Sequence, residues 1–251
     1  MPIKIAAPSV QSLFLEMRFS GQKVATGTGF LADSKIGTVL ITNRHNVSGR
    51  HPQTGKCLSA TGSVPDEVVI MHNQKGLLGN WKPVLEPLVN ENDMPLWHEH
   101  PILKEKGDFV ALPLTQTEGI ECYKYSLENN GPDIMVGPSD YVSVVGFPFG
   151  MNAGGALAIW ATGFLASELD IDQWGMPIVL IDCRARPGQS GSAVIAYRSS
   201  GMVPMRGGGA AAFPGPVTKL IGIYSGRVNP ESDLGIVWKT SALKELVDSI
   251  S

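Results

Sequence analysis

The chain has 251 residues, of which 43% are hydrophobic and 17% charged, and its formal net charge is −3. This length and apolar content suffice for a buried core in one large unit or in two fused lobes. The sequence contains no run rich in lysine and arginine, which argues against nucleic acid or an anionic membrane as a partner. The 29 glycines and 18 prolines favour many short strands and turns over long helices.

The cysteines and the N-terminal segment bear on the compartment. Cys57, Cys122 and Cys183 are widely spaced and odd in number, which predicts neither a disulfide framework nor a zinc site. The segment that begins Met1-Pro2-Ile3 lacks a long apolar stretch, and no run approaches membrane-spanning length. We therefore expect a cytoplasmic protein. A secreted protein whose signal peptide had been removed would look similar.

The first part of the chain predicts short strands. Residues 12–20 alternate, with Leu13, Leu15, Met17 and Phe19 on one face, which is typical of a half-buried antiparallel strand. Residues 48–65 predict a polar loop, and the proline-rich stretch 73–106 allows no assignment. The further strands are predicted at 26–31, 38–42, 66–72 and 107–112.

The later part of the chain has the same texture after a connector at 121–139. The glycine-rich excursion at 198–216 has two interpretations, a long hairpin tip and a flap that contacts substrate. Residues 240–250 have helical spacing, with Thr240 or Ser241 as the expected N-cap. The strands are predicted at 141–145, 156–162, 178–182, 193–197, 220–224 and 235–238. Two strand-rich parts, 9–120 and 140–239, followed by one helix predict an all-β architecture of two packed barrels or sandwiches.

The segment Arg186-Pro187-Gly188-Gln189-Ser190-Gly191-Ser192 carries the main functional signal. A serine hydroxyl becomes a useful nucleophile only beside a base, and neighbouring glycines allow a tight turn with room for a substrate. Such a turn can direct the backbone N–H groups of Gly188 and Ser190 at one point, as an oxyanion hole. Taken alone, the segment is better explained as a glycine-rich β-turn.

Two further motifs favour the catalytic interpretation. His45 follows an apolar strand, and Asp108 opens another, so Ser190, His45 and Asp108 suggest a nucleophile, a base and an orienting acid. Asp66 and Asp93 are weaker candidates for the acid because neither opens a strand behind a glycine. Unlike Ser190, Ser192 has no glycine on its C-terminal side and none two positions before it, and the Gly-x-Ser-x-Gly elbow of α/β-hydrolases is absent.

Six segments, in order, resemble the chymotrypsin-fold (trypsin-like) serine proteases, and most closely the bacterial Deg-type protease domains. The resemblance spans roughly residues 9–249. It implies two packed six-stranded antiparallel β-barrels with a short C-terminal helix, and a His45/Asp108/Ser190 triad in the cleft between the barrels. It also implies a polypeptide substrate and neither a cofactor nor a metal. The segments are Gly27-Thr28-Gly29-Phe30-Leu31, Leu40–Val47, Gly107–Leu112, Gly146-Phe147-Pro148-Phe149-Gly150, Arg186–Ser192 and Leu234–Trp238 with the helix.

Several residues depart from the pattern of the digestive enzymes. Gln189 replaces the acid that pairs with a newly cut N-terminus in zymogens, so activation by cleavage is not expected. By the family's layout, Arg184 lies at the base of the pocket for the residue before the scissile bond. There it would disfavour basic residues, unless it points to solvent or pairs with a carboxylate. Tyr224, Ser225 and Gly226 are expected to offer a main-chain edge to the substrate.

The other histidines predict no site. His51 and His72 are expected at the surface or in loops, and His98 and His100 in a solvated loop rather than at a metal. The sequence therefore predicts a serine endopeptidase that works through an acyl-enzyme at Ser190. The alternatives are a catalytically silent binding module with a protease fold and a protease that processes only itself.

Overall fold

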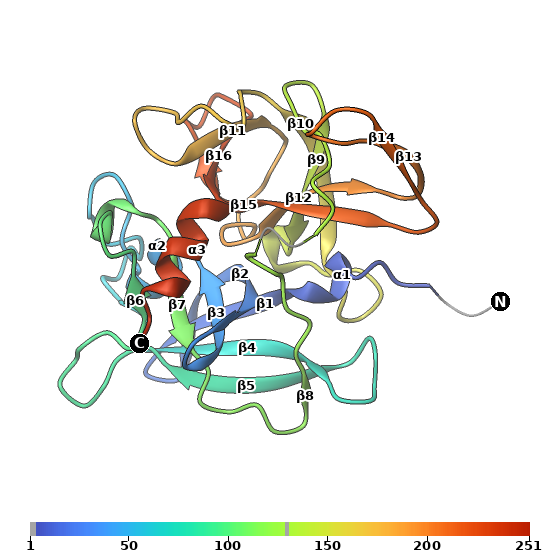
Figure 1. Ribbon diagram of the computed structural model, residues 1–251. Helices are drawn as coiled ribbons and strands as arrows, with labels where there is room; N and C mark the ends of the chain where they lie inside the picture. Colours follow the sequence, from blue (N-terminus) through green and yellow to red (C-terminus); the bar gives the residue numbers. More distant parts are fainter. Residues whose placement is uncertain (1–3, 129–130) are drawn as a thin grey trace.

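The computed structural model describes residues 4–128 and 131–251, so residues 129–130 of the predicted connector and residues 1–3 lie outside the description (Figure 1). The N-terminal half contains α1 (Pro8–Gln11), β1 (Ser12–Phe19), β2 (Gln22–Ser34), β3 (Gly37–Thr42), α2 (Arg44–Ser48), β4 (Glu67–Gln74), β5 (Trp81–Pro87), β6 (His98–Glu99), the 3₁₀ turn η1 (Lys104–Lys106), β7 (Val110–Pro113) and β8 (Ile120–Glu121). The C-terminal half contains β9 (Tyr141–Gly146), the 3₁₀ turn η2 (Pro148–Gly150), β10 (Ile159–Leu165), β11 (Ile178–Asp182), β12 (Ala193–Arg198), β13 (Gly201–Pro204), β14 (Ala210–Phe213), β15 (Val217–Arg227), β16 (Leu234–Lys239) and α3 (Thr240–Asp248).

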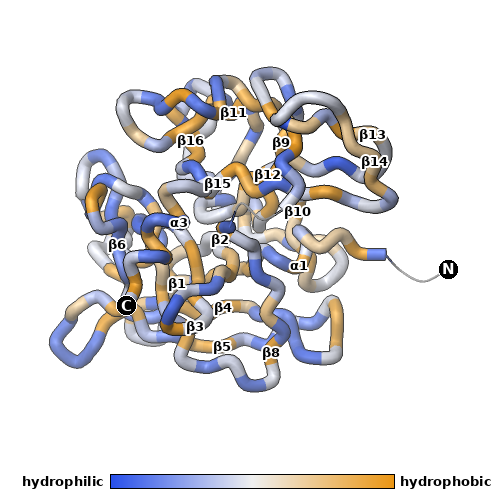
Figure 2. The backbone as a smooth tube through the Cα atoms, viewed as in Figure 1, coloured by the Kyte–Doolittle hydropathy of each residue, from blue (hydrophilic) through white to orange (hydrophobic). Residues whose placement is uncertain are grey.

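The C-terminal half forms a closed barrel with the strand order β10-β11-β16-β15-β12-β9. All of its pairings are antiparallel, as predicted. Its interior is filled by aliphatic side chains such as Val144, Val179, Ile181 and Val237, each of them fully buried. Inward-facing residues alternate with outward-facing ones along each strand, and these branched side chains come from β9, β11 and β16. Figure 2 shows apolar stretches within the strands of both halves.

The N-terminal half is a strongly buried antiparallel sheet with the order β5-β4-β1-β2-β3-β7-β6, and β8 pairs with β4. Among the described residues this sheet has eight strands, two more than predicted. The additional strands, β6 and β8, are only two residues long and extend the pairing of β7 and β4. The prediction of an all-β protein with two strand-rich halves is confirmed, and the N-terminal half differs from a six-stranded barrel in this detail.

β1 is more buried than its alternating sequence predicts. Leu13, Leu15 and Met17 face the core of the N-terminal half, as expected. Phe14 faces the other way but is 6% exposed, because its ring packs against Trp81 and Phe147 at centroid distances of 5.7 and 5.6 Å. At Phe14 the opposite face of the strand is therefore covered by Trp81 of β5 and by Phe147 of the C-terminal half, which the strand pattern alone does not reveal.

The two halves share one hydrophobic cluster, and α3 takes part in it (Figure 1). Leu243 and Leu246 of α3 are fully buried and belong to the same cluster as Phe30 and Phe109 of the N-terminal half. The predicted helix is confirmed. The predicted N-cap, Thr240 or Ser241, is wrong: the N-cap is Lys239, whose side chain has no acceptor for a capping bond, and the Thr240 hydroxyl donates to the Leu220 carbonyl.

The excursion at 198–216 is a β-hairpin formed by β13 and β14. Val203 is buried in the core of the C-terminal half. Beyond its own strands, the hairpin makes backbone hydrogen bonds from Met135 to Pro204 and from Arg206 to Asp133. These contacts hold it against the segment before β9. The excursion therefore has the conformation of a hairpin, and its contact with a substrate stays a prediction.

His72 and His100 are both buried, contrary to the expectation of surface or loop positions. His100 is 2% exposed, and its Nδ1 accepts the backbone N–H groups of Ile102 and Leu103. Its Nε2 lies 3.2 Å from Glu245 of α3. His72 of β4 is fully buried, and neither ring nitrogen has a hydrogen-bond partner within the described residues. Desolvation lowers the pKa of His72 from 6.5 to about 4.

We expect His72 to make the protein less stable in mild acid. The unfolded chain protonates this imidazole near pH 6.5 and the folded chain only near pH 4, so the unfolded state binds more protons in between. The contribution of neutral His72 to the free energy of unfolding is fully present above the unfolded pKa. It decreases by about 3 kcal/mol as the pH drops through this window. Urea unfolding between pH 7.5 and 4 measures it. The curve for His72→Leu should be flatter, while exposed His51→Gln should follow the wild type. Parallel curves for all three proteins would rule the explanation out.

Candidate active site

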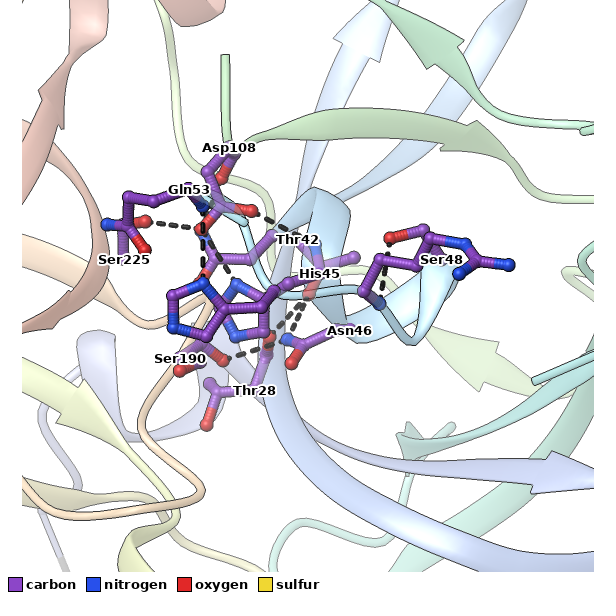
Figure 3. Close-up of polar contacts among 12 residues, drawn as sticks. Thr28, Thr42, His45, Asn46, Ser48, Gln53, Asp108, Ser190 and Ser225 are labelled. Carbon is purple, nitrogen blue, oxygen red and sulfur yellow. Dashed lines mark hydrogen bonds and ion pairs between the residues drawn. The ribbon is translucent and has the colours of Figure 1, made fainter. Parts of the chain in front are cut away.

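His45 lies directly after β3, on the single helical turn α2, which the sequence did not predict. Its Nδ1 is 2.7 Å from Asp108 Oδ2, and its backbone N–H donates to Asp108 Oδ1 at 3.0 Å (Figure 3). Buried Asn43 donates its amide to the Asp108 carbonyl at 2.7 Å, which fixes the backbone on both sides of the pair. The predicted histidine and acid are therefore in contact, and the geometry orients the imidazole through Nδ1.

Asp108 lies two residues before β7 rather than at the first position of the strand. Its side chain is only 5% exposed, and its two carboxylate oxygens accept three donors. Two of these donors belong to His45, and the third is the Ser225 hydroxyl of β15, which donates to Oδ2. The Asp108 carboxylate therefore holds the His45 ring, the His45 backbone and the Ser225 hydroxyl in one hydrogen-bond network.

Ser225 therefore has a role that the sequence analysis missed. It was expected to contribute to a main-chain edge, and its hydroxyl instead contacts the acid of the candidate triad. No local pattern could reveal this contact, because 117 residues separate the two partners. The main-chain role of Ser225 and Gly226 toward a substrate stays a prediction.

Ser190 follows a turn whose geometry can be derived from its sequence. The backbone N–H of Gln189 donates to the Arg186 carbonyl at 3.1 Å, and Gly188 has φ = +92°. Pro187 and Gly188 thus occupy the second and third positions of a type II turn, which favours proline and then glycine. Fully buried Gln189 closes the turn a second time, because its Oε1 accepts the Arg186 N–H at 2.8 Å. These two hydrogen bonds within the segment therefore hold the turn in shape. The side chain at position 189 is an uncharged amide and not a carboxylate that could pair with a charged N-terminus.

Four successive carbonyl groups of this segment, from Pro187 to Ser190, each accept a hydrogen bond. Phe149 N–H donates to the Pro187 carbonyl at 2.7 Å, the Thr28 hydroxyl to the Gly188 carbonyl at 2.8 Å, and Ser192 N–H to the Gln189 carbonyl at 3.0 Å. The Ser190 carbonyl accepts two donors, Thr28 N–H at 2.9 Å and the Asn46 amide at 3.1 Å. Each bond fixes the plane of one peptide group, because the carbonyl and the following N–H are rigidly coupled. In the part of the chain that the structure describes, the N–H groups of Gly188 and Ser190 have no hydrogen-bond partner.

The third side chain of the predicted triad lies close to the other two without a direct bond. Asn46, the neighbour of His45 on α2, donates to the Ser190 carbonyl and so ties the histidine turn to the serine turn. Figure 3 shows His45, Asp108 and Ser190 together in one close-up. In the part of the chain that the structure describes, Ser190 Oγ and the His45 ring are not joined by a hydrogen bond. Catalytic hydrogen bonds in substrate-free sites are often long and shorten only when a substrate is bound.

Arg184 and Tyr224, which were both predicted to contact the substrate, differ in their exposure to solvent. Arg184 is 83% exposed and lies 3.7 Å from the Asp233 carboxylate, which matches the alternative of a solvent-exposed, paired guanidinium. Tyr224 is 3% exposed, its N–H donates to Ser192, and its carbonyl accepts Gly191 N–H. The expectation that Tyr224 offers a main-chain edge is therefore wrong, because both of its backbone groups are already bonded. Burial also raises the pKa of its hydroxyl.

No group of three or more histidine, cysteine or carboxylate side chains within the described residues could hold a metal ion. No helix in the described ranges is long and apolar enough to cross a membrane. Burial raises the pKa of the Cys183 thiol to about 11, so this side chain is a poor nucleophile near neutral pH.

No protein-family model and no curated protein matches the sequence. Solved structures do match. The inactive form of the Rv3671c protease from M. tuberculosis is 14% identical, with a TM-score of 0.52 over 96% of this chain and 88% of that one. The active form of that protease has a TM-score of 0.53 at 14% identity and covers 96% of this chain and 80% of that one. A serine endoprotease from Yersinia pestis has a TM-score of 0.53 at 11% identity and covers 97% of this chain and 66% of that one.

The fold is that of the chymotrypsin-like serine proteases. A chymotrypsin-like fold explains why His45 and Asp108 come from the N-terminal half while Ser190 and Ser225 come from the C-terminal half. Each half supplies a rigid sheet, and the candidate site forms where their loops meet. The identity to these structures is low, so the likeness establishes the fold, and the chemistry depends on the side chains of this chain.

Proposed function

We propose that this protein is a serine endopeptidase that hydrolyses polypeptides through an acyl-enzyme at Ser190, with a triad of His45, Asp108 and Ser190. The observation that carries the proposal is that, among the described residues, the N–H groups of Gly188 and Ser190 have no hydrogen-bond partner. One belongs to the candidate nucleophile and the other to the residue two positions before it, and the bonded carbonyls of Pro187 and Gln189 fix the two peptide planes that carry them. A backbone arranged in this way can accept the negative charge that develops on a substrate carbonyl oxygen.

In the proposed reaction, His45 Nε2 takes the proton of Ser190 as the hydroxyl oxygen attacks the peptide carbonyl. Asp108 keeps the other ring nitrogen protonated through the 2.7 Å contact and stabilises the imidazolium that forms. His45 then gives the proton to the departing amine, which leaves the acyl group on Ser190. A water molecule, deprotonated by the same imidazole, releases the acyl group.

The test is labelling of the native protein with a fluorophosphonate, which reacts with an activated serine. We expect one label per chain, localised to Ser190 by peptide mass spectrometry. The label should disappear in Ser190→Ala and in the heat-denatured protein, because nucleophilicity depends on the assembled site. A folded sample that takes no label would contradict the proposal and favour the binding-module alternative. A labelled protein that cleaves no added polypeptide but has a trimmed intact mass would favour self-processing.

A further inference from the structure

Thr28 of β2 lies at the junction between the two halves of the molecule. It is fully buried, and every polar group it has is used. Its N–H donates to the Ser190 carbonyl at 2.9 Å, and its carbonyl accepts the Thr42 hydroxyl at 2.8 Å. Its own hydroxyl donates to the Gly188 carbonyl at 2.8 Å and accepts Phe147 N–H at 3.2 Å. One side chain of the N-terminal half thereby contacts two loops of the C-terminal half.

The chain makes room for this residue on two sides. A Cβ on Gly146 would lie 2.8 Å from the Thr28 hydroxyl and 1.9 Å from Ser192 Oγ. A Cβ on Gly191 would lie 1.9 Å from the Thr28 carbonyl oxygen. Both distances to the Thr28 oxygens are shorter than a Cβ contact allows, so the close approach of β2 to the serine turn requires glycine at both places.

The Thr28 hydroxyl acts on the part of the turn that matters for the proposed chemistry. Gly188 has peptide groups on both sides, and the carbonyl of Pro187 is held by Phe149 N–H while the carbonyl of Gly188 is held by Thr28. The Gly188 N–H lies in the same peptide plane as the Pro187 carbonyl, so Phe149 N–H fixes it, while the Thr28 hydroxyl fixes the plane on the other side of Gly188. Phe147 and Phe149 belong to the same loop, so the hydroxyl steadies this loop as well as the turn.

We propose that Thr28 is a positioning residue that preorganises the oxyanion hole. Its hydroxyl holds the peptide plane after Gly188 and also the Phe147–Phe149 loop, which in turn holds the plane that carries the Gly188 N–H. The inference rests on the proposed function and extends it to a side chain that does not contact the reacting atoms. Preorganised donors stabilise a transition state because they need no rearrangement during the reaction. Without the hydroxyl, the Gly188 carbonyl and the Phe147 N–H both lose their partner, and the turn can rotate.

The test compares Thr28→Val, which keeps the shape and removes the hydroxyl, with Thr28→Ser, which keeps the hydroxyl. We expect Thr28→Val to slow fluorophosphonate labelling of Ser190 by about 10- to 100-fold, and Thr28→Ser to stay within about threefold of the wild type. Ser12→Ala is the matched control, because the buried Ser12 hydroxyl also joins the two halves, donating to the Val145 carbonyl at 2.7 Å. It should lower the melting temperature without changing the labelling rate.

A second readout separates this inference from the proposed function. In ¹⁵N–¹H spectra, the Gly188 amide signal should move in Thr28→Val and remain in place in Thr28→Ser and Ser12→Ala. This holds even if the wild-type protein takes no label, a result that would contradict the proposed function alone. A folded Thr28→Val with the wild-type labelling rate or an unshifted Gly188 signal would overturn the inference. If Thr28→Val does not fold, Thr28→Ala replaces it under the same criteria.

Discussion

Replacing Asp108 with asparagine should reduce turnover by about 10⁴-fold while the protein stays folded. The reason is that the two carboxylate oxygens accept three donors: His45 N–H on Oδ1, and His45 Nδ1–H and the Ser225 hydroxyl on Oδ2. An amide has only one acceptor oxygen. If its NH₂ group faces the imidazole, the ring must carry its proton on Nε2, and it can then no longer accept the proton of Ser190.

The amide cannot avoid this conflict by flipping. With its NH₂ group turned toward the His45 backbone, two donors would face each other at the 3.0 Å contact that holds α2 in place. The measurement is the rate of fluorophosphonate labelling together with cleavage of an unfolded polypeptide such as casein. Asp93→Asn is the matched control, because Asp93 is exposed and the sequence alone also allowed it as the acid. Equal losses in the two variants, or no loss in Asp108→Asn, would refute the assignment.

Gly188→Ala should lower turnover by about 10²- to 10³-fold, the effect of losing one oxyanion donor. A Cβ at this position would lie 2.5 Å from the Phe147 carbonyl oxygen and 3.1 Å from Phe149 N. Both are backbone atoms that cannot move aside as a flexible side chain would, so the turn must shift and carry the Gly188 N–H with it. The turn lies outside the strands, and we expect the barrel to remain folded.

A second glycine provides an unusually close control for this variant. Gly208, between β13 and β14, has φ = +93°, against +92° for Gly188, but a Cβ there would meet no atom within 4 Å. Gly208→Ala therefore introduces the same left-handed strain without the clash. It should cost about 1 kcal/mol of stability or slightly more and leave the labelling rate unchanged. If both variants lost activity equally, backbone strain rather than the position of the Gly188 N–H would be the cause.

Much of the secondary structure could be predicted from sequence because its signals are local. Alternation over residues 12–20 indicated β1, and the helical spacing of Ala242, Leu243 and Leu246 indicated α3. Residues 73–106 gave no signal because β5 contains two prolines and β6 has only two residues, so neither shows a clear period. The exposure of His72 was predicted wrongly because the sequence does not indicate whether a histidine in a strand faces the core or the solvent.

The sequence by itself determined the strand-rich class, the C-terminal helix and the identity of the candidate residues His45, Asp108 and Ser190. It could do so because periodicity, glycine placement and motif order are properties of short segments. Only the tertiary structure decided which groups meet. The Ser225 hydroxyl on Asp108 and the Thr28 hydroxyl on Gly188 join residues 117 and 160 positions apart. Such contacts depend on how two sheets pack against each other, and the packing surface comes from all of their buried side chains together.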